Sequence, residues 1–579
     1  MLKIKLQIAE KIYAGVKGIN PDAEIAIEDI ASMLEYPPDA SMGDLAFPCF
    51  KLSKALRRSP VQIAAALADG LSGGALASAE AVNGYLNIKI DNAYLGEKIL
   101  PEILEKKENY GAPTYLGEGK TVVLDYSSPN VAKPFHIGHL GTTVIGHALK
   151  KLHEFAGYKC IGINYLGDWG TQFGKLIVAY KLWGHKEQIE QGGIDKLVEL
   201  YVRINNTIKG DEENGIPARE DLADQAREEF HKMEIGDEDN IALWKWFVEI
   251  SLEEYQKTYR QLGIEFDSYK GESFYTDKMP AQVEKLKASG LMKIDDGASI
   301  VDLEPYGMPP CLILKRDGST LYPTRDIAAA VYRKNTYDYD KSIYVTSAGQ
   351  SLHFAQWFKV VELMGYDWHD KLVHVPYGTV SINGAKLATR TGNVVLLKDL
   401  FRAAIEEVSN IMTEKNPNIE NKEEIAEAVG VGAIVFYYLS NSRIKDINFV
   451  MEDALNFDGN TGPYAQYTYA RTCAVLRRAE GEVAPASLSI TSPDEAALLK
   501  VLAKFPEKVN AAIEDYEPSV ITRYILDVAA AFNRFYHNCQ ILSAQDPNVR
   551  ATRVAITRAT NVVLGNAFPL ICMKKMEKI

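Results

Sequence analysis

Two β-forming runs, 121–126 and 159–166, enclose a stretch at 144–155 in which apolar residues recur at helical spacing. The first run ends in the turn 127–130, and the second ends in the turn 167–170, which carries two glycines. Strand, turn, helix and strand in this order form a βαβ unit, which requires two parallel strands in one sheet. We therefore expect an α/β fold built on a parallel sheet.

The length of 579 residues, at roughly 150 residues per domain, predicts three or four domains. Near the start, Ser59 and Pro60 open a helix, and residues 84–90 alternate like a half-buried strand. From about Phe401 the patterns are almost entirely helical. We expect a small α/β unit at 1–110, a parallel-sheet domain at 120–400 with a helical insertion at about 184–275, a helical connecting region at 401–454 and a helical tail at 455–579.

Charge and cysteine use exclude several classes of protein. The chain holds 64 Lys and Arg against 77 Asp and Glu, which argues against a basic coat for indiscriminate nucleic-acid binding. The tail is less acidic, with 14 Lys and Arg and 12 Asp and Glu at 455–579, so an RNA contact is expected there. Six widely spaced cysteines form neither a zinc-ribbon nor a disulfide pattern. Without a signal peptide or an apolar run of ~18 residues, we expect a soluble, cytoplasmic protein without membrane contact.

Chemistry concentrates in the segment from Lys133 to His139. If a helix starts near His136, the imidazoles of His136 and His139 share one face beside its N-terminus, where exposed N–H groups favour phosphate. Gly138 would let a planar base or ribose approach the backbone closely. Two imidazole donors and Lys133 can then stabilise charge that grows on a phosphoryl group.

Two simpler interpretations compete with this one. Two histidines three residues apart can bind a metal, but no third ligand follows at the usual spacing. They can also be ordinary polar residues at a helix start, and a His-x-x-His match alone is a weak signal.

The wider pattern resembles class I aminoacyl-tRNA synthetases, and within them the arginyl-tRNA synthetase family. The similarity is clearest at Ser127–Pro129, at Asn130 and in the histidine segment, Lys133–His139. The matching blocks run in the family's order from about residue 40 to the end. The other matching blocks are 43–46, 167–174, 317–328, 347–354 and 460–467.

This resemblance implies a Rossmann-like catalytic domain, an added N-terminal domain that contacts tRNA, and an all-helical anticodon-binding domain. It also implies the reaction: the carboxylate of L-arginine attacks the α-phosphate of ATP, pyrophosphate leaves, and the arginyl group passes to the terminal adenosine of tRNA(Arg). Positioning and charge stabilisation should dominate such catalysis. ATP implies Mg²⁺, no dedicated metal site is expected, and we expect a monomer.

Arginine recognition needs anions and hydrogen-bond acceptors that face the guanidinium, a planar group of donors that never loses its charge. The family match places contacts to the amino acid at Asp125, Ser128, Asn130, His139, Tyr322, Asp326 and Gln350. We infer that Tyr322 and Asp326 face the guanidinium and that the others serve the amino and carboxylate end or fix the pocket. The ordinary alternative for Asp326 is a partner of Arg325 or a helix cap.

The second signature of the class, a Lys-Met-Ser-Lys-Ser loop, is altered here. Lys386 matches its first lysine, but Thr389 stands where the second is expected. A positively charged side chain is still needed beside the departing pyrophosphate, and Lys133 and Arg390 are the candidates. The plain alternative for Lys133 is a solvated loop lysine. A second departure is Gly141-Thr142, where many relatives carry Arg-Ser.

In the tail, Tyr464, Gln466 and Arg471 are the expected tRNA contacts, because aromatic faces and cations together grip unstacked bases. Tyrosines in such a stretch can equally pack in a helix core. Two other interpretations of the whole chain stay open: a nucleotidyltransferase that uses no RNA, and a catalytically silent relative that senses arginine or acts as a scaffold.

Overall fold

The structure is a computed structural model that describes the whole chain except residues 211–216, 317, 383–384, 387–394, 416–418 and 481–487. Its centre is a four-stranded sheet of parallel strands in the order β10-β9-β4-β5. The strands are β4 (Thr121–Asp125), β5 (Lys159–Ile163), β9 (Lys341–Ser347) and β10 (Leu372–Tyr377). The expected α/β fold with a parallel sheet is confirmed.

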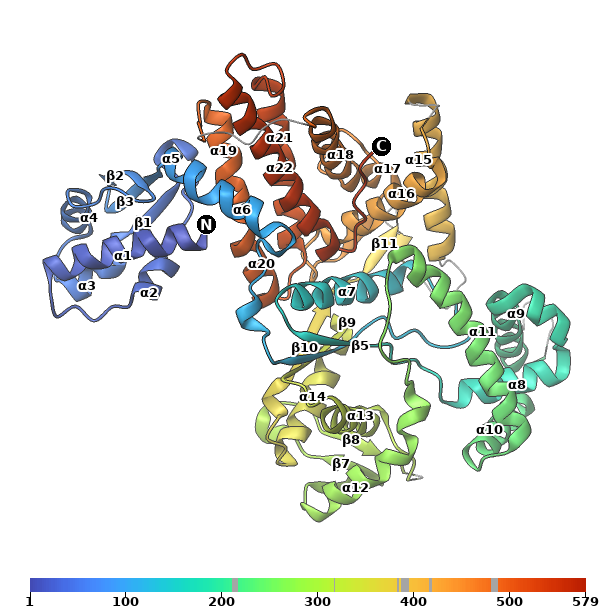
Figure 1. Cartoon of the computed structure of the whole chain (residues 1–579). Helices are drawn as coiled ribbons and strands as arrows, with labels where there is room; N and C mark the ends of the chain where they lie inside the picture. The colour runs from blue at the N-terminus through green and yellow to red at the C-terminus, as the bar shows by residue number, and fades with distance from the viewer. Residues whose placement is uncertain (211–216, 317, 383–384, 387–394, 416–418, 481–487) are drawn as a thin grey trace.

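The two faces of this sheet are covered by different helices. Val122 and Leu124 belong to the same apolar cluster as α7 (Leu140–Phe155), whereas Val123 belongs to the cluster of α13 (Tyr322–Tyr337) and α14 (Ser351–Leu363). Figure 1 shows α7 on one side of the sheet and α13 and α14 on the other. Because side chains alternate along a strand, this run of apolar residues supplies both cores.

The strand order also places a binding site. From β4 the chain passes to β5 on one side, and β9 and β10 are added later on the other side. The sheet order therefore reverses between β4 and β9. Open parallel sheets bind ligands outside the carboxyl ends of their strands at such a switch point.

The segment between β5 and α13 holds an insertion. It contains the helices α8 (Thr171–Trp183), α9 (Lys186–Lys209), α10 (Asp221–Glu234), α11 (Glu238–Leu262) and α12 (Met279–Ala288). A small antiparallel sheet of β6 (Met292–Asp295), β7 (Ala298–Val301) and β8 (Cys311–Leu314) follows, which the sequence analysis did not predict.

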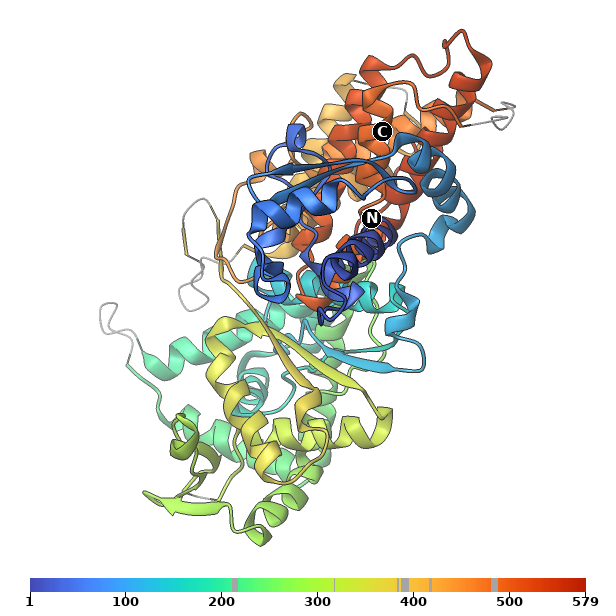
Figure 2. The ribbon, with the colours of Figure 1, turned by 90° about the vertical axis from the view of Figure 1, so that its left-hand side faces the viewer.

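The N-terminal region is a separate α/β unit with its own antiparallel sheet, in the order β1-β3-β2. Its elements are α1 (Leu2–Ile19), α2 (Ile27–Met33), β1 (Leu45–Pro48), α4 (Pro60–Ala68), β2 (Leu76–Val82) and β3 (Tyr85–Ile90), followed by α6 (Leu100–Lys106). It lies beside the C-terminal helices in both ribbon views, and the ion pairs Lys5–Glu507 and Lys500–Asp44 join the two regions (Figures 1 and 2).

In its described residues the C-terminal region is helical, as expected, with one exception. Its helices are α15 (Leu397–Lys415), α16 (Lys422–Leu439), α17 (Met451–Ala454), α18 (Gly462–Arg478), α19 (Pro493–Leu502), α20 (Phe505–Glu514), α21 (Ser519–Asn538) and α22 (Pro547–Leu570). The exception is β13 (Ile447–Phe449), which pairs in parallel with β11 (Val380–Ile382). This pairing ties the connecting region to the chain that leaves the central sheet.

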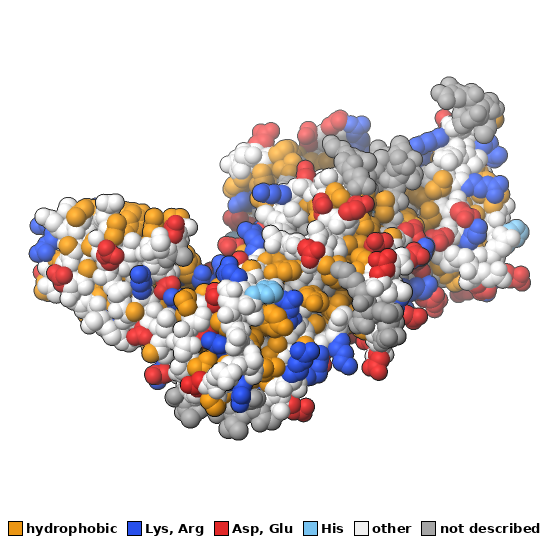
Figure 3. Space-filling view, turned by 90° about the horizontal axis from the view of Figure 1, so that it is seen from above, with side chains coloured by type: hydrophobic (Ala, Val, Ile, Leu, Met, Phe, Trp, Pro, Cys, Tyr) orange, Lys and Arg blue, Asp and Glu red, His pale blue; other side chains and the backbone are white. Residues whose placement is uncertain are grey.

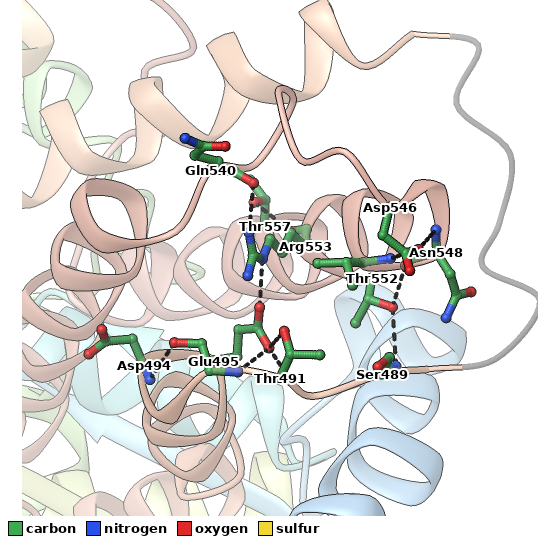
Figure 4. A network of polar contacts seen from close by, with 12 residues as sticks. Ser489, Thr491, Asp494, Glu495, Gln540, Asp546, Asn548, Thr552, Arg553 and Thr557 are labelled. Carbon is green, nitrogen blue, oxygen red and sulfur yellow. Dashed lines mark hydrogen bonds and ion pairs between the residues drawn. The ribbon is translucent and has the colours of Figure 1, made fainter.

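A polar network fastens α19 to α22 (Figure 4). Glu495 is fully buried, and its Oε1 accepts from Arg553 Nε at 2.6 Å while its Oε2 accepts the Thr491 N–H at 2.6 Å. Arg553 Nη1 donates to Gln540 O at 2.9 Å. Because both charges are paired and hydrogen-bonded, this buried ion pair is tolerated between the helices.

On the face of Figure 3, Lys and Arg side chains are interspersed with Asp and Glu, so this face carries no uniform basic coat. Among the described residues, no helix is long and apolar enough to cross a membrane.

Candidate active site

A cavity of about 560 Å³ lies at the carboxyl ends of β4 and β9, at the switch point of the sheet. All seven residues predicted to contact the amino acid line it, although they come from three separate parts of the chain. They are Asp125, Ser128, Asn130, His139, Tyr322, Asp326 and Gln350.

The turn after β4 holds an unusual backbone at one wall of this cavity. Ser127 and Ser128 have φ angles of +72° and +45°, which residues with a Cβ rarely adopt. Their hydrogen bonds hold the turn: the Ser127 N–H donates to Thr142 Oγ1 at 2.9 Å, and Ser128 Oγ donates to Asp125 Oδ1 at 3.0 Å. Ser128 thus orients Asp125 and lines the cavity itself.

The histidine segment forms a helix start, as the sequence predicted. His136 is the N-cap of a short turn, Ile137–His139, that leads into α7, and the two imidazole centres lie 3.9 Å apart. His136 Nδ1 accepts the Gly138 N–H at 3.1 Å, and His139 Nδ1 accepts the His136 N–H at 3.2 Å. Since a neutral imidazole that accepts at Nδ1 carries its proton at Nε2, both rings offer an Nε2–H donor.

These rings are neutral near pH 7. Burial lowers the pKa of His136 to about 4 and that of His139 to about 3, and the charge of Lys133 acts in the same direction. Lys133 is half-buried, which counts against its interpretation as a solvated loop lysine, and burial lowers its pKa as well. The segment therefore combines two neutral donors with one nearby ammonium.

Glycine is required at two positions in and just after the histidine segment. A Cβ at Gly138 would press against the His136 ring, so His136 itself, besides any bound base or ribose, explains the glycine. A Cβ at Gly141 would clash with the Tyr438 hydroxyl from α16. The space beside Gly141 is thus filled by this tyrosine.

The chain just beyond the altered second signature lies next to the histidine segment. Lys386 belongs to the short strand β12 (Ala385–Lys386), whereas Thr389 and Arg390 lie outside the described residues. The chain that follows pairs with the histidine segment: the Ile137 N–H donates to Val395 O at 3.1 Å. Val395 is thereby joined to the helix start.

The acidic residues of the cavity have partners that sequence reasoning missed. Asp125 Oδ2 forms a 2.7 Å ion pair with Arg333 Nη1, and the Arg333 side chain is 1% exposed. Asp326 Oδ2 lies 2.6 Å from His353 Nε2, so neither Arg325 nor a capping role explains this aspartate, which is the fifth residue of α13.

A further acidic residue, Glu272, also lines the cavity. Its Oε2 forms a 2.6 Å ion pair with Arg325 Nη1. Burial raises the pKa of Glu272 to about 7, Arg325 opposes the shift, and the negative charges of Asp326 and Asp168 add to it. Glu272 lies near the end of the expected insertion, in a stretch without any recognisable motif, so the sequence carries no signal for it.

The three residues predicted to contact tRNA lie on α18 but face different ways. Arg471 lies between the rings of Tyr467 and Tyr536, 5.0 and 4.9 Å from their centres, at a groove of about 610 Å³. Tyr464 accepts a hydrogen bond from Asn533 Nδ2 at 2.9 Å. Gln466 is fully buried and donates to Lys574 O at 3.1 Å, so it offers no exposed side chain for the RNA contact predicted for it.

Comparison with known proteins agrees with this geometry. A family model described as "tRNA synthetases class I (R), catalytic domain" matches residues 99–451. Models of the arginyl tRNA synthetase N terminal domain and the DALR anticodon binding domain match residues 4–90 and 465–579. The chain is thus a class I tRNA synthetase.

Two similar proteins identify the family within that class. An arginine–tRNA ligase of Alkaliphilus metalliredigens is 47% identical and aligns over 100% of both chains. One of Clostridioides difficile is 49% identical over 96% of this chain and 97% of its own. The chain belongs to the arginyl-tRNA synthetase family. The solved structure of Thermus thermophilus arginyl-tRNA synthetase superposes with a TM-score of 0.83 at 25% identity and covers 99% of each chain.

Proposed function

We propose that this chain activates L-arginine with ATP and transfers the arginyl group to the 3′ adenosine of tRNA(Arg), releasing AMP and pyrophosphate. The observation that carries the proposal is the single cavity that collects the family's amino-acid contacts beside a phosphate-binding helix start. The full-length relatives, which are named arginine–tRNA ligases, support it.

The guanidinium of the substrate binds at the acidic end of the cavity. Asp326 and Glu272 both line this end, and Tyr322 lies one helical turn before Asp326 on α13. Carboxylate oxygens match the planar fork of a guanidinium in both charge and direction. Asp125, already paired with Arg333, fixes the pocket together with Ser128 rather than attracting the guanidinium.

The other end of the cavity holds the reacting atoms. Asn130 and Gln350 serve the amino and carboxylate groups of arginine, and His139 reaches the α-phosphate that the carboxylate attacks. His136 and His139 donate Nε2–H bonds to phosphoryl oxygens, the Gly138 backbone lies against the nucleotide, and Lys133 and Lys386, with Arg390 as an alternative, neutralise the departing pyrophosphate.

Magnesium enters this scheme as a companion of ATP. Among the described residues, no group of three His, Cys, Asp or Glu side chains could hold a metal ion. We therefore assign Mg²⁺ to the ATP phosphates, where it would offset negative charge, and no protein side chain is assigned to it.

tRNA(Arg) contacts the N-terminal unit and the groove on α18. The groove combines two exposed rings, Tyr467 and Tyr536, with Arg471, and Tyr464 orients the polar neighbour Asn533. Stacking and cations together suit unpaired bases. The proposed enzyme acts as a monomer, and its six free thiols fit a reducing cytoplasm.

One measurement separates this proposal from its alternatives: arginine-dependent exchange of pyrophosphate into ATP, with and without tRNA, followed by charging of tRNA(Arg). A ligase exchanges in at least one condition and charges the tRNA. A nucleotidyltransferase that uses no RNA would transfer nucleotide without charging tRNA, and a silent sensor would bind arginine without either reaction.

A further inference from the structure

The two carboxylates at the acidic end of the cavity are each occupied on one oxygen. Asp326 Oδ2 is held by His353 Nε2 at 2.6 Å, and Glu272 Oε2 is held by Arg325 Nη1 at 2.6 Å. Among the described residues, the contact of the Asp326 carboxylate is through Oδ2, and Oδ1 has no hydrogen-bond partner. The carboxylate therefore has one oxygen fixed by the protein and one left over.

His353 stands in the right place to act on substrate recognition. Gln350 precedes α14 and His353 is the third residue of that helix, so the two lie one turn apart, and both line the cavity. The side chains of His353 and Asp326 are 27% and 21% exposed, so their contact lies at the cavity wall rather than in the core. A tie that only joined α13 to α14 would not need to face the cavity.

The residues around His353 hold it in place. Phe354, the next residue on α14, stacks on His374 of β10 with ring centres 4.3 Å apart and planes 5° apart. His374 Nε2 in turn lies 2.8 Å from Thr346 Oγ1 on β9. The start of α14 is thus fastened to β10 and, through His374, to β9 of the central sheet.

We infer that His353 is a positioning residue for arginine recognition: by binding Asp326 Oδ2, it turns Asp326 Oδ1 toward the substrate guanidinium. This inference rests on the proposed function. Fixing the carboxylate before the substrate arrives lowers the entropy lost on binding, and it suits a planar fork better than a freely rotating carboxylate would.

The test compares three variants in steady-state charging of tRNA(Arg). His353→Met removes the donor with little loss of volume. His353→Gln keeps an amide N–H near the place of Nε2. His231→Met is the control, because His231 lies exposed on α10, away from the cavity.

We expect His353→Met to raise the KM for arginine about tenfold while the KM for ATP stays within about twofold. His353→Gln should restore most of the loss, and His231→Met should match the wild type. In an Asp326→Asn background, His353→Met should add little, because the oxygen that it would orient has lost its charge.

Equal rises in the KM for arginine and for ATP would overturn the inference, as would an undiminished effect of His353→Met beside Asp326→Asn, which would mean direct contact with the substrate. If His353→Met does not fold, His353→Asn takes its place, since its shorter amide does not reach Asp326. A wild-type enzyme that fails to charge tRNA with arginine would instead refute the proposed function.

Discussion

The catalytic cavity and helix α18 differ in whether the residues predicted to share a site lie together in the structure. In the cavity, seven residues predicted from three distant segments meet around one space. On α18, three residues predicted within eight positions separate, with Arg471 at a groove, Tyr464 in a polar contact and Gln466 in the core. The separation of residues along the chain was therefore a poor guide to whether they lie at the same site.

Helix geometry explains the scatter on α18. Residues seven apart, such as Tyr464 and Arg471, lie on the same side of a helix, whereas residues two apart, such as Tyr464 and Gln466, point about 200° apart. Tyr467, three residues after Tyr464 and four before Arg471, shares their face and is 45% exposed. The aromatic and basic pattern was informative, but the helical period had to be applied to it.

The sharpest test of the cavity removes one donor while keeping the helix start. His139→Asn retains an acceptor near Nδ1 for the His136 N–H but lacks the Nε2–H donor. We expect single-turnover adenylate formation to fall about 100- to 1000-fold, since a donor aimed at transition-state charge is lost. His231→Asn on α10 is the matched control, and an unchanged rate in His139→Asn would remove this imidazole from catalysis.

Lys133 offers the next largest effect. Lys133→Ala should lower the rate of adenylate formation about 100-fold, because positive charge on the leaving pyrophosphate is lost. Arginine binding should stay nearly intact, since Lys133 does not line the cavity of about 560 Å³. Rapid-quench measurement of activation, with arginine affinity from equilibrium titration, separates the two, and an unaltered activation rate would favour Arg390 instead.

At the acidic end, Asp326→Ala should raise the KM for arginine about 30-fold and leave the KM for ATP nearly constant. The expected size follows from losing a hydrogen bond between two charged groups, about 2 kcal/mol. Steady-state charging with each substrate varied in turn measures both constants. Equal losses for arginine and ATP would argue that Asp326 supports the fold and not the guanidinium.

Protonation of Glu272 gives a smaller effect with a defined sign. Its raised pKa of about 7 means that the empty site gains a proton as the pH falls below 7 and loses an anion for the guanidinium. Because arginine binds the ionised form, the KM for arginine should rise roughly tenfold between pH 8 and pH 6. His136 and His139, with pKa values of about 4 and 3, stay neutral over this range.

Glu272→Gln provides the control for this pH dependence. The variant should bind arginine more weakly at pH 8 than the wild type does, but its KM should change little between pH 8 and pH 6. A wild-type KM that is flat over this range would contradict the assignment.

The sequence predicted the parallel sheet because apolar runs and turns are local signals. The family resemblance, and not the strand pattern, supplied the residues that line the cavity. Sequence reasoning missed Arg333, His353 and Glu272, whose importance lies in partners 208, 27 and 53 residues away. It also missed the sheet at 292–314, whose strands are only four residues long. Pairing across such distances leaves no periodic trace in one sequence.

The smallest effects test the two faces of α18. Arg471→Ala should raise the KM for tRNA about fivefold and lower the dependence of binding on salt by about one phosphate contact. Gln466→Leu, five residues away on another face, should leave tRNA binding unchanged but destabilise the fold by about 1 kcal/mol, because the bond to Lys574 O is lost. Filter binding at several salt concentrations and thermal unfolding measure these outcomes. If Gln466→Leu weakened tRNA binding as much as Arg471→Ala did, the assignment of one side of α18 to the core and another to tRNA would be wrong.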